Sequence, residues 1–216
     1  MSNVKQKDRN QESSISRRKF LKGVGTGAVA ATVHPTALVK AEPSEEIQAN
    51  GEIRRAEITL MINGHVYSVE IEPRTTLLSV LRDGFDTRGK RFNLTGAKLI
   101  CDRGECGGCT VQVDGKPIYS CMILAIDAQN KNITTVEGLA TGDRLNPVQE
   151  AFVEHDALMC GFCTPGFIVA SQSLLDENPK PTLKEIKLAL SGNICRCGTY
   201  PFIFEAVQTA SRKMGG

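Results

Sequence analysis

The stretch Cys101-Asp-Arg-Gly-Glu-Cys-Gly-Gly-Cys109 decides the fold of the chain around it, and a fourth cysteine follows at Cys121. Three thiolates this close together, with a distant fourth, have the spacing of ligands to a [2Fe–2S] cluster. Such ligands require a chain that wraps tightly around the inorganic core. Gly104, Gly107 and Gly108 permit positive φ angles and a close approach of backbone N–H groups to the sulfides. These N–H groups would stabilise the negative charge of the cluster.

The other four cysteines form a second compact group, in which Cys160-x2-Cys163 is followed by Cys195-x-Cys197. The chain has eight cysteines, so two groups of four leave none over. Four thiolates per group match the ligand count of two [2Fe–2S] clusters. With two one-electron centres and no other visible chemistry, the sequence predicts a protein that transfers electrons. The predicted ligands are Cys101, Cys106, Cys109 and Cys121 for the first cluster, and Cys160, Cys163, Cys195 and Cys197 for the second.

Two other uses of the cysteines stay open, a zinc site and a set of disulfides. Zinc ribbons usually place two Cys-x2-Cys knuckles on separate turns, whereas the first group has the Cys-x4-Cys-x2-Cys spacing of plant-type ferredoxins. Disulfides are common in secreted proteins, but they do not explain why cysteines sit in a glycine-rich loop, and Cys195 and Cys197 make a poor intramolecular pair. Either alternative would make the chain a binding module without redox function.

The residues around the first group predict a β-grasp [2Fe–2S] ferredoxin domain over 56–136. Strands are expected at 56–62 and 65–71, and Asn63-Gly64 between them is a strong hairpin turn. A helix follows at 76–83 with Thr75 or Thr76 as its cap, then a second hairpin at 110–119 and a closing strand at 133–136. Two hairpins and one helix packed across a small mixed sheet give the β-grasp outline.

The pattern becomes helical in a second domain, 147–216, after a connector at 137–146. Asn146 and Pro147 begin a helix that runs to about residue 157, and three more helices are expected at about 164–176, after Thr182, and at about 201–214. The third is expected to turn Leu183, Ile186 and Leu190 inward. The whole chain is therefore predicted to be α+β, with the second cluster near the centre of the four-helix bundle.

A basic leader precedes these domains. Residues 1–41 contain eight Lys or Arg and two acidic residues, and Ser16-Arg-Arg-Lys-Phe-Leu-Lys22 matches a twin-arginine export signal. A mildly apolar stretch of small residues follows, with a candidate cleavage point after Ala41. The leader predicts a periplasmic protein exported already folded, with 42–55 as a linker. Thiolates already bound to iron would not form disulfides.

The remaining sequence excludes several classes of function. The net charge of +2 gives no reason to expect nucleic-acid binding. The chain has no apolar run long enough for a transmembrane helix, and no glycine loop in a strand–helix setting that would cradle a nucleotide. There is also no nucleophile–base arrangement, so we expect no catalytic residue on this chain.

The cysteine spacing and two motifs of the second group resemble a known family. Cys160-Gly-Phe-Cys-Thr-Pro-Gly166 and Asn193-Ile-Cys-Arg-Cys197 are similar to the iron–sulfur subunit of the molybdenum hydroxylases, which include xanthine dehydrogenases and aldehyde oxidoreductases. The resemblance covers nearly all of the chain after residue 56. Together with the export signal, it is most similar to the small subunits of periplasmic aldehyde oxidoreductases.

The resemblance implies a role in a complex. A separate large subunit would bind molybdopterin and oxidise or hydroxylate an aldehyde or an N-heterocycle. Electrons would leave through this chain, first by the cluster of Cys160, Cys163, Cys195 and Cys197 beside the pterin, then by the distal cluster of Cys101, Cys106, Cys109 and Cys121. The acceptor would be an FAD subunit, a cytochrome or another external carrier.

One motif departs from the family pattern. Many members read Cys-Arg-Cys-Thr-Gly-Tyr, whereas this chain has Gly198-Thr199-Tyr200 after Cys197. The variant resembles members that are coupled to cytochromes or other carriers, so a flavin subunit does not follow from the resemblance. A free-standing ferredoxin that serves several partners is a further alternative.

Overall fold

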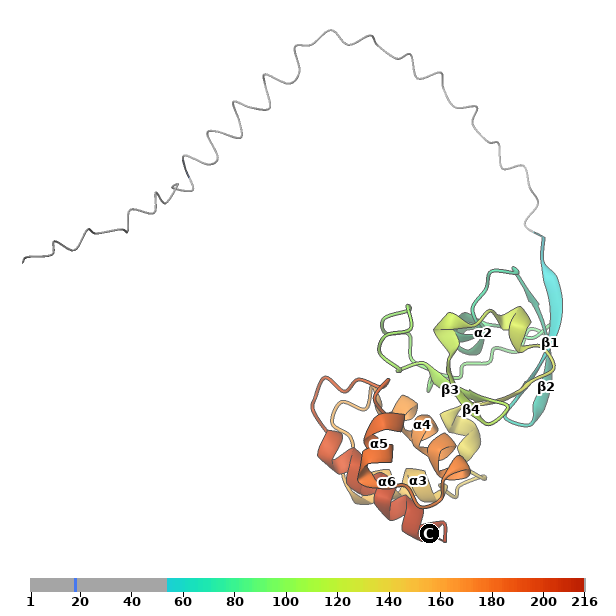
Figure 1. Ribbon diagram of the computed structural model, residues 1–216. Coiled ribbons are helices and arrows are strands. Elements are labelled where there is room, and N and C mark those ends of the chain that lie inside the picture. The colour runs from blue at the N-terminus through green and yellow to red at the C-terminus, as the bar shows by residue number, and fades with distance from the viewer. Residues whose placement is uncertain (1–17, 19–53, 216) are drawn as a thin grey trace, which may run out of the picture. The chain divides into compact units, whose positions relative to one another are not determined.

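The computed structural model describes Arg18 and residues 54–215. The predicted export signal at 1–41 and linker at 42–55 therefore lie outside the described residues, except for Arg18 and the last two linker positions. The described chain from 54 onward contains a sheet with one covering helix, followed by a group of four helices (Figure 1). This is the mixed α and β composition that the sequence predicts.

Five strands form one mixed sheet in the order β2-β1-β5-β3-β4. β1 (Ala56–Ile62) pairs antiparallel with β2 (His65–Ile71), and β3 (Thr110–Val113) pairs antiparallel with β4 (Lys116–Tyr119). The short β5 (Asn132–Thr134) joins the two hairpins, parallel to β1 and antiparallel to β3. Both hairpins were predicted in these positions.

The two hairpin turns explain why the strands fall where they do. Asn63 and Gly64 have φ angles of 51° and 78°, and Asp114 and Gly115 have 51° and 80°. Asparagine, aspartate and glycine are the residues that accept positive φ most easily, so each pair closes a two-residue hairpin. The turn chemistry fixes the register of both hairpins.

The helix α2 (Leu77–Asp83) packs on the sheet, as predicted. The side chain of Thr76 accepts a hydrogen bond from the backbone N–H of Ser79 and so caps its first turn. Its buried leucines and valine join the inward side chains of β1 in one hydrophobic core. Short 3-10 helices η1 (Ser120–Met122), η2 (Ala125–Ala128) and η3 (Val136–Leu139) complete this part.

The four remaining helices are α3 (Pro147–Glu154), α4 (Thr164–Glu177), α5 (Leu183–Ala189) and α6 (Tyr200–Lys213). α3 and α5 both begin with a capping box, formed by Asn146 with Gln149 and by Thr182 with Glu185. A second hydrophobic core fills the space among these helices, with Phe152 and Phe167 as its largest fully buried side chains.

The prediction for the inner face of α5 was wrong at one position. Ile186 and Leu190 are buried as expected, but the side chain of Leu183 is 42% exposed. Leu183 is the first residue of a helix of only seven residues, in which Ile186 is the buried residue. α3 also ends earlier than predicted, because His155 is its C-cap and Asp156 adopts a positive φ of 47°.

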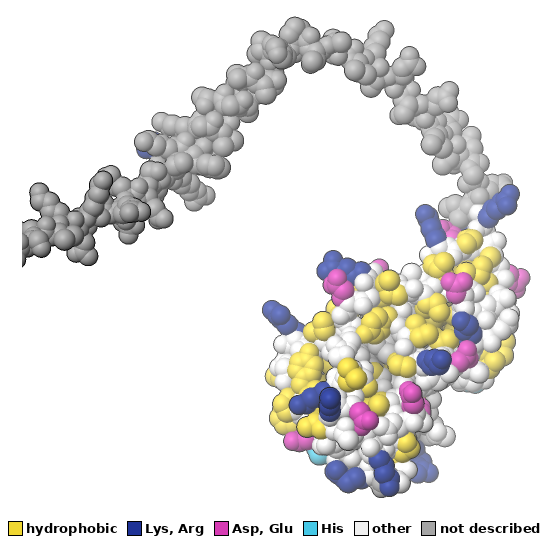
Figure 2. Space-filling view, viewed as in Figure 1, with side chains coloured by type: hydrophobic (Ala, Val, Ile, Leu, Met, Phe, Trp, Pro, Cys, Tyr) yellow, Lys and Arg dark blue, Asp and Glu magenta, His cyan; other side chains and the backbone are white. Residues whose placement is uncertain are grey.

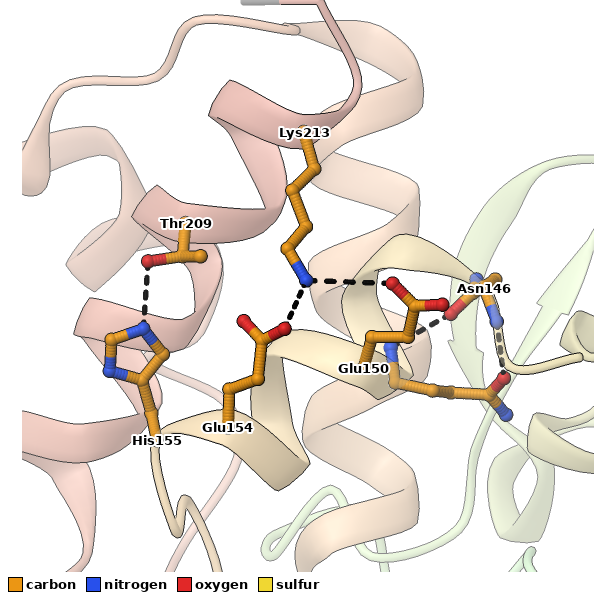
Figure 3. Close-up of polar contacts among 7 residues, drawn as sticks. Asn146, Glu150, Glu154, His155, Thr209 and Lys213 are labelled. Carbon is orange, nitrogen blue, oxygen red and sulfur yellow. Dashed lines mark hydrogen bonds and ion pairs between the residues drawn. The ribbon is translucent and has the colours of Figure 1, made fainter.

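Polar contacts join α3 to α6 at the surface (Figure 3). Lys213 Nζ lies 3.5 Å from Glu150 Oε2 and also bonds Glu154 Oε1, and His155 Nε2 lies 2.8 Å from Thr209 Oγ1. The ion pairs are exposed, so they contribute little to stability compared with the buried contacts beneath them.

The helices also pack against the sheet. Gln112 Nε2 on β3 donates to Ser173 Oγ at 3.0 Å and to Asp176 Oδ2 at 3.2 Å, both on α4. The Tyr119 hydroxyl at the end of β4 donates to the Gly192 carbonyl at 2.8 Å. The first two contacts join α4 to the sheet, and the third joins the loop before α6 to the end of the second hairpin, two residues from Cys121.

Hydrophobic side chains remain on the surface of both parts, among charged ones (Figure 2). Several lie beside cysteines, namely Ile100 before Cys101, Phe162 in the turn before α4 and Ile194 in the turn before α6, and each is between 44% and 52% exposed. None of the helices in the described residues is both long and apolar enough to cross a membrane.

Candidate metal centre

The first cysteine group occupies an irregular loop between α2 and β3. Positive φ angles at Asp102 (54°), Gly104 (76°) and Gly107 (68°) turn the backbone around the space that the thiols face. Cys101 and Cys106 are half-buried, whereas Cys109 and Cys121 are buried. Cys121 lies in η1, so the loop and the end of the second hairpin supply the four thiols from two places in the chain.

The second group comes from two turns that precede helices. Cys160 and Cys163 lie in the turn before α4, and Cys195 and Cys197 lie in the turn before α6. Gly161 and Gly198 adopt φ angles of 75° and 82°, which these turns require. The structure thus brings together four thiols that are up to 37 residues apart in the sequence.

Within each group the thiols meet in pairs. Cys160 Sγ and Cys197 Sγ are 3.5 Å apart, and the thiols of Cys163 and Cys195 lie within hydrogen-bonding reach of one another. In the first group, Cys101 contacts Cys106 and Cys109 contacts Cys121. The described residues contain no set of three or more His, Cys, Asp or Glu side chains arranged around a single ion. Two thiolates for each of two irons is the arrangement of a [2Fe–2S] cluster.

The surroundings of the thiols shift their acidity in opposite directions. Burial raises the pKa of Cys109 to about 12 and that of Cys163 to about 12. A hydrogen bond from the backbone N–H of Arg103 lowers the pKa of Cys101 to about 7. Burial also opposes ionisation of Cys195, but hydrogen bonds from Thr199, Cys163 and Gly198 outweigh it and lower its pKa to about 7.

A small pocket of about 160 Å³ lies between the two groups. All four thiols of the second group line it together with Cys106 of the first, and its apolar wall consists of Ile100, Phe162 and Ile194 beside Arg196. Cys160 and Cys197 are exposed. The second group therefore extends from the helical core, where Cys195 is buried and Cys163 packs against it, to the surface at Cys160 and Cys197.

The loop that carries Cys101, Cys106 and Cys109 is hydrogen-bonded directly to the turn that carries Cys195 and Cys197, and these two segments are the two cysteine-bearing loops that contact each other. The backbone N–H of Ile194 donates to the carbonyl of Cys106 at 2.9 Å. Asn193 Nδ2 donates to the Gly107 carbonyl at 2.9 Å, and Asn193 is only 5% exposed. A cysteine of the first group and a neighbour of Cys195 are thus linked by one hydrogen bond.

The sequence analysis missed two side chains that contact Cys195. Thr199 Oγ1 lies 3.1 Å from Cys195 Sγ, and the backbone N–H of Cys195 donates to the Tyr200 hydroxyl at 2.9 Å. Their position next to the last ligand was visible, and hydroxyl groups this close to a sulfur ligand are a signal that could have identified them.

The chemistry of the donor set fits an iron–sulfur cluster. Thiolates are soft ligands that iron–sulfur clusters prefer, and they occur here in pairs within turns rich in positive φ angles. The hydroxyl of Thr164, the residue after Cys163, is buried and has no hydrogen-bond partner among the described residues. A buried donor without a partner is costly unless a bound group accepts from it.

Comparison with known proteins agrees with this reading of the helical part. Residues 135–208 match the family described as the [2Fe-2S] binding domain. The match takes in Cys160, Cys163, Cys195 and Cys197.

Individual relatives extend the similarity over nearly the whole chain. The aldehyde oxidoreductase iron-sulfur-binding subunit PaoA of Escherichia coli O157:H7 is 37% identical over 92% of this chain and 89% of its own length. The nicotine 6-hydroxylase small subunit of Paenarthrobacter nicotinovorans is 45% identical over 74% of this chain and 93% of its own.

A solved structure shares the fold. In quinoline 2-oxidoreductase from Pseudomonas putida 86, a chain that is 39% identical superposes with a TM-score of 0.68 over 74% of this chain and 98% of its own. At these identities and coverages, the chain belongs to the iron–sulfur small subunits of the aldehyde oxidoreductase and xanthine dehydrogenase family, the molybdenum hydroxylases.

Proposed function

We propose that this chain carries electrons through two [2Fe–2S] clusters inside a molybdenum hydroxylase complex. The observation that carries the proposal is the placement of the eight thiols as four pairs in two groups, with the loop of the first group hydrogen-bonded to the turn that carries Cys195 and Cys197. The ligands would be Cys101, Cys106, Cys109 and Cys121 for the first cluster, and Cys160, Cys163, Cys195 and Cys197 for the second.

The sheet and α2 would then be a β-grasp ferredoxin domain, residues 56–136, and α3 to α6 a helical [2Fe–2S] domain, residues 147–216. The strand order and the single covering helix support the first assignment. The loop between that helix and the second hairpin also supplies three of the four thiols of the first group. The connector at 137–146 would let each part keep its own hydrophobic core.

Each cluster, once bound, would supply a one-electron redox centre. The protein's part is to hold and insulate it. Cys109, Cys121 and Cys195 keep one side of each thiol set away from water. The hydrogen bond from Ile194 to the Cys106 carbonyl holds the two loops at a fixed spacing and offers a short route between them.

The exposed side of the second group suggests the order of transfer. Cys160 and Cys197 are exposed, and apolar side chains surround them. We place the partner there: a large subunit that binds molybdopterin and oxidises an aldehyde or an N-heterocycle. Electrons would enter at the second cluster and leave from the first, to an FAD subunit, a cytochrome or another carrier. The relatives named above support this choice of partner, since they are subunits of aldehyde and N-heterocycle oxidising enzymes.

The proposal is tested by electron paramagnetic resonance on the dithionite-reduced, purified chain, with iron and zinc measured on the same sample. Two distinct rhombic signals and about four irons per chain are expected. A silent spectrum from a chain that contains zinc, or no metal, would contradict the proposal and favour a structural use of the cysteines. Two signals from a chain that never co-purifies with a large subunit would favour the free-standing ferredoxin.

We further propose that the chain is exported folded to the periplasm by the twin-arginine route. The paired arginines at 17 and 18 and the basic, weakly apolar leader support this. Replacing both with lysine, Arg17→Lys with Arg18→Lys, keeps the charge and should hold the protein in the cytoplasmic fraction. The matched control is Lys5→Arg with Lys7→Arg, which should leave export unchanged. Periplasmic protein from the double-lysine variant would refute the proposal.

A further inference from the structure

We propose that Thr199 raises the reduction potential of the second cluster by donating a hydrogen bond to the sulfur of Cys195. Thr199 acts through Cys195, so it is a positioning residue and not a ligand. The inference rests on the proposed function, because it requires Cys195 to hold iron.

The contact is short and enclosed. Thr199 Oγ1 lies 3.1 Å from Cys195 Sγ, and the two residues are only 3% and 6% exposed. A thiolate that binds iron has no proton to give, so Thr199 must be the donor. The backbone N–H groups of Thr199 and Gly198 also donate to this sulfur and would remain in a side-chain variant, so removing the hydroxyl takes away one donor from a site with little access to water.

The hydroxyl is also not needed for the role that threonine usually has at this position. Thr199 is the N-cap of α6, where a threonine oxygen commonly accepts a hydrogen bond from a backbone N–H of the first turn. Here the side chain makes no such bond, and the backbone angles of φ −74° and ψ 13° are not those of an extended cap. The hydroxyl is therefore free to donate to the sulfur.

The electrostatic consequence follows from the charge of the reduced state. Reduction adds one electron, with no proton taken up and no bond made or broken, and it increases the negative charge on the thiolate sulfurs. A donor aimed at Cys195 Sγ stabilises that charge more strongly than the charge of the oxidised state. Hydrogen bonds to the sulfurs are one of the factors that set cluster potentials.

The test is a redox titration of the full chain followed by electron paramagnetic resonance. Thr199→Val keeps the shape and removes the donor, and we expect it to lower the equilibrium constant for reduction of the second cluster about tenfold, or about 59 mV for one electron. Thr199→Ser keeps the donor and should stay near the unaltered value. The first cluster should not shift in either variant. The second cluster's signal is the one missing from a Cys163→Ser sample.

Thr209→Val is the matched control. Thr209 lies on the same helix and its hydroxyl bonds His155 (Figure 3), at the far end of α6 from Cys195. The substitution replaces a threonine hydroxyl by a methyl group, as Thr199→Val does, but far from the cluster. It should therefore leave both reduction potentials unchanged. A shift in this control as large as that in Thr199→Val would overturn the inference.

Other outcomes are equally decisive. An unchanged potential in a fully loaded Thr199→Val sample would overturn the inference, as would an equal shift in Thr199→Ser. If the Thr199→Val chain does not bind the second cluster, Thr199→Ala is the second variant to titrate. If neither variant binds that cluster, the Thr199 side chain is needed for cluster binding, and the inference that it tunes the potential is overturned. Failure of the proposed function would be seen earlier, as fewer than four irons in the unaltered chain.

Discussion

Replacing Cys163 with serine is expected to halve the iron content of the chain, from about four irons to about two, and to abolish turnover of the complex. Cys163 lies between the pocket and the helical core, and its thiol meets that of Cys195. Serine has nearly the same shape, but its hydroxyl is far less acidic than a thiol and is a harder, weaker ligand for an iron–sulfur cluster. The expected result is loss of one paramagnetic signal and retention of the other.

The loss of turnover follows from the order of transfer proposed above. If electrons enter at the second cluster, an intact first cluster has no way to receive them. Cys101→Ser is the matched variant in the other group, because Cys101 is also half-buried and paired. It should remove the other signal and leave the Cys163 group loaded, with steady-state turnover also lost because the exit is blocked.

The two variants separate the assignments from each other. Iron content, the reduced spectrum and turnover with the substrate of the complex are measured on both, and the far-ultraviolet circular dichroism spectrum checks that the helices remain. A Cys163→Ser complex that keeps full turnover would refute the electron path. A variant that loses both signals at once would show that the two groups are not independent sites.

Sequence patterns predicted the turns, helix starts and cysteine groups, because neighbouring residues determine them. Asn63-Gly64 and Asp114-Gly115 determine their hairpins because few other residue pairs accept two successive positive φ angles. Thr182 and Glu185 likewise define the start of α5 within four residues. The spacing of the cysteines identified both groups, since ligand spacing is itself a local property.

The structure added what depends on contacts between distant residues. The depth of Leu183 could not be read from its spacing, because whether the first residue of a short helix reaches the core depends on the neighbouring helices. The hydrogen bond between Asn193 and Gly107 joins residues 86 positions apart. The contact between Thr199 and Cys195 depends on the rotation of the first turn of α6, which the sequence does not determine.

Substituting Gly166 with alanine is the second large effect that we expect, and its sign is the reverse of the usual one. Within a helix, alanine is normally more favourable than glycine by about 1 kcal/mol. In this structure a Cβ on Gly166 would overlap the carbonyl oxygen of Gly107 and would lie 3.1 Å from Asn193 Nδ2. Both obstacles belong to the contact between the two cysteine-bearing loops, and one of them is backbone that cannot rotate away.

The expected cost is that of overpacking, about 1–3 kcal/mol. For a chain of this size, this lowers the melting temperature by about 2–4 °C per kcal/mol. The strain falls on the loop that contains Cys106 and Cys109, so loss of visible absorbance from the first cluster should begin at a lower temperature than in the unaltered chain. Thermal melts followed by circular dichroism and by cluster absorbance measure the two effects together.

Two controls separate the overlap from other causes. A Cβ on Gly142 meets no atom within 4 Å, but its φ is +60°, so Gly142→Ala should show backbone strain of about 1–2 kcal/mol without early loss of cluster absorbance. Asn193→Ala removes the amide side chain that a Cβ on Gly166 would contact, and so relieves part of the overlap. The Gly166→Ala and Asn193→Ala effects should therefore not add, since residues in contact commonly couple by about 0.5–3 kcal/mol. A Gly166→Ala chain that is more stable than the unaltered one would show that the loops move apart freely, and the fixed spacing between the two cysteine groups would then be wrong.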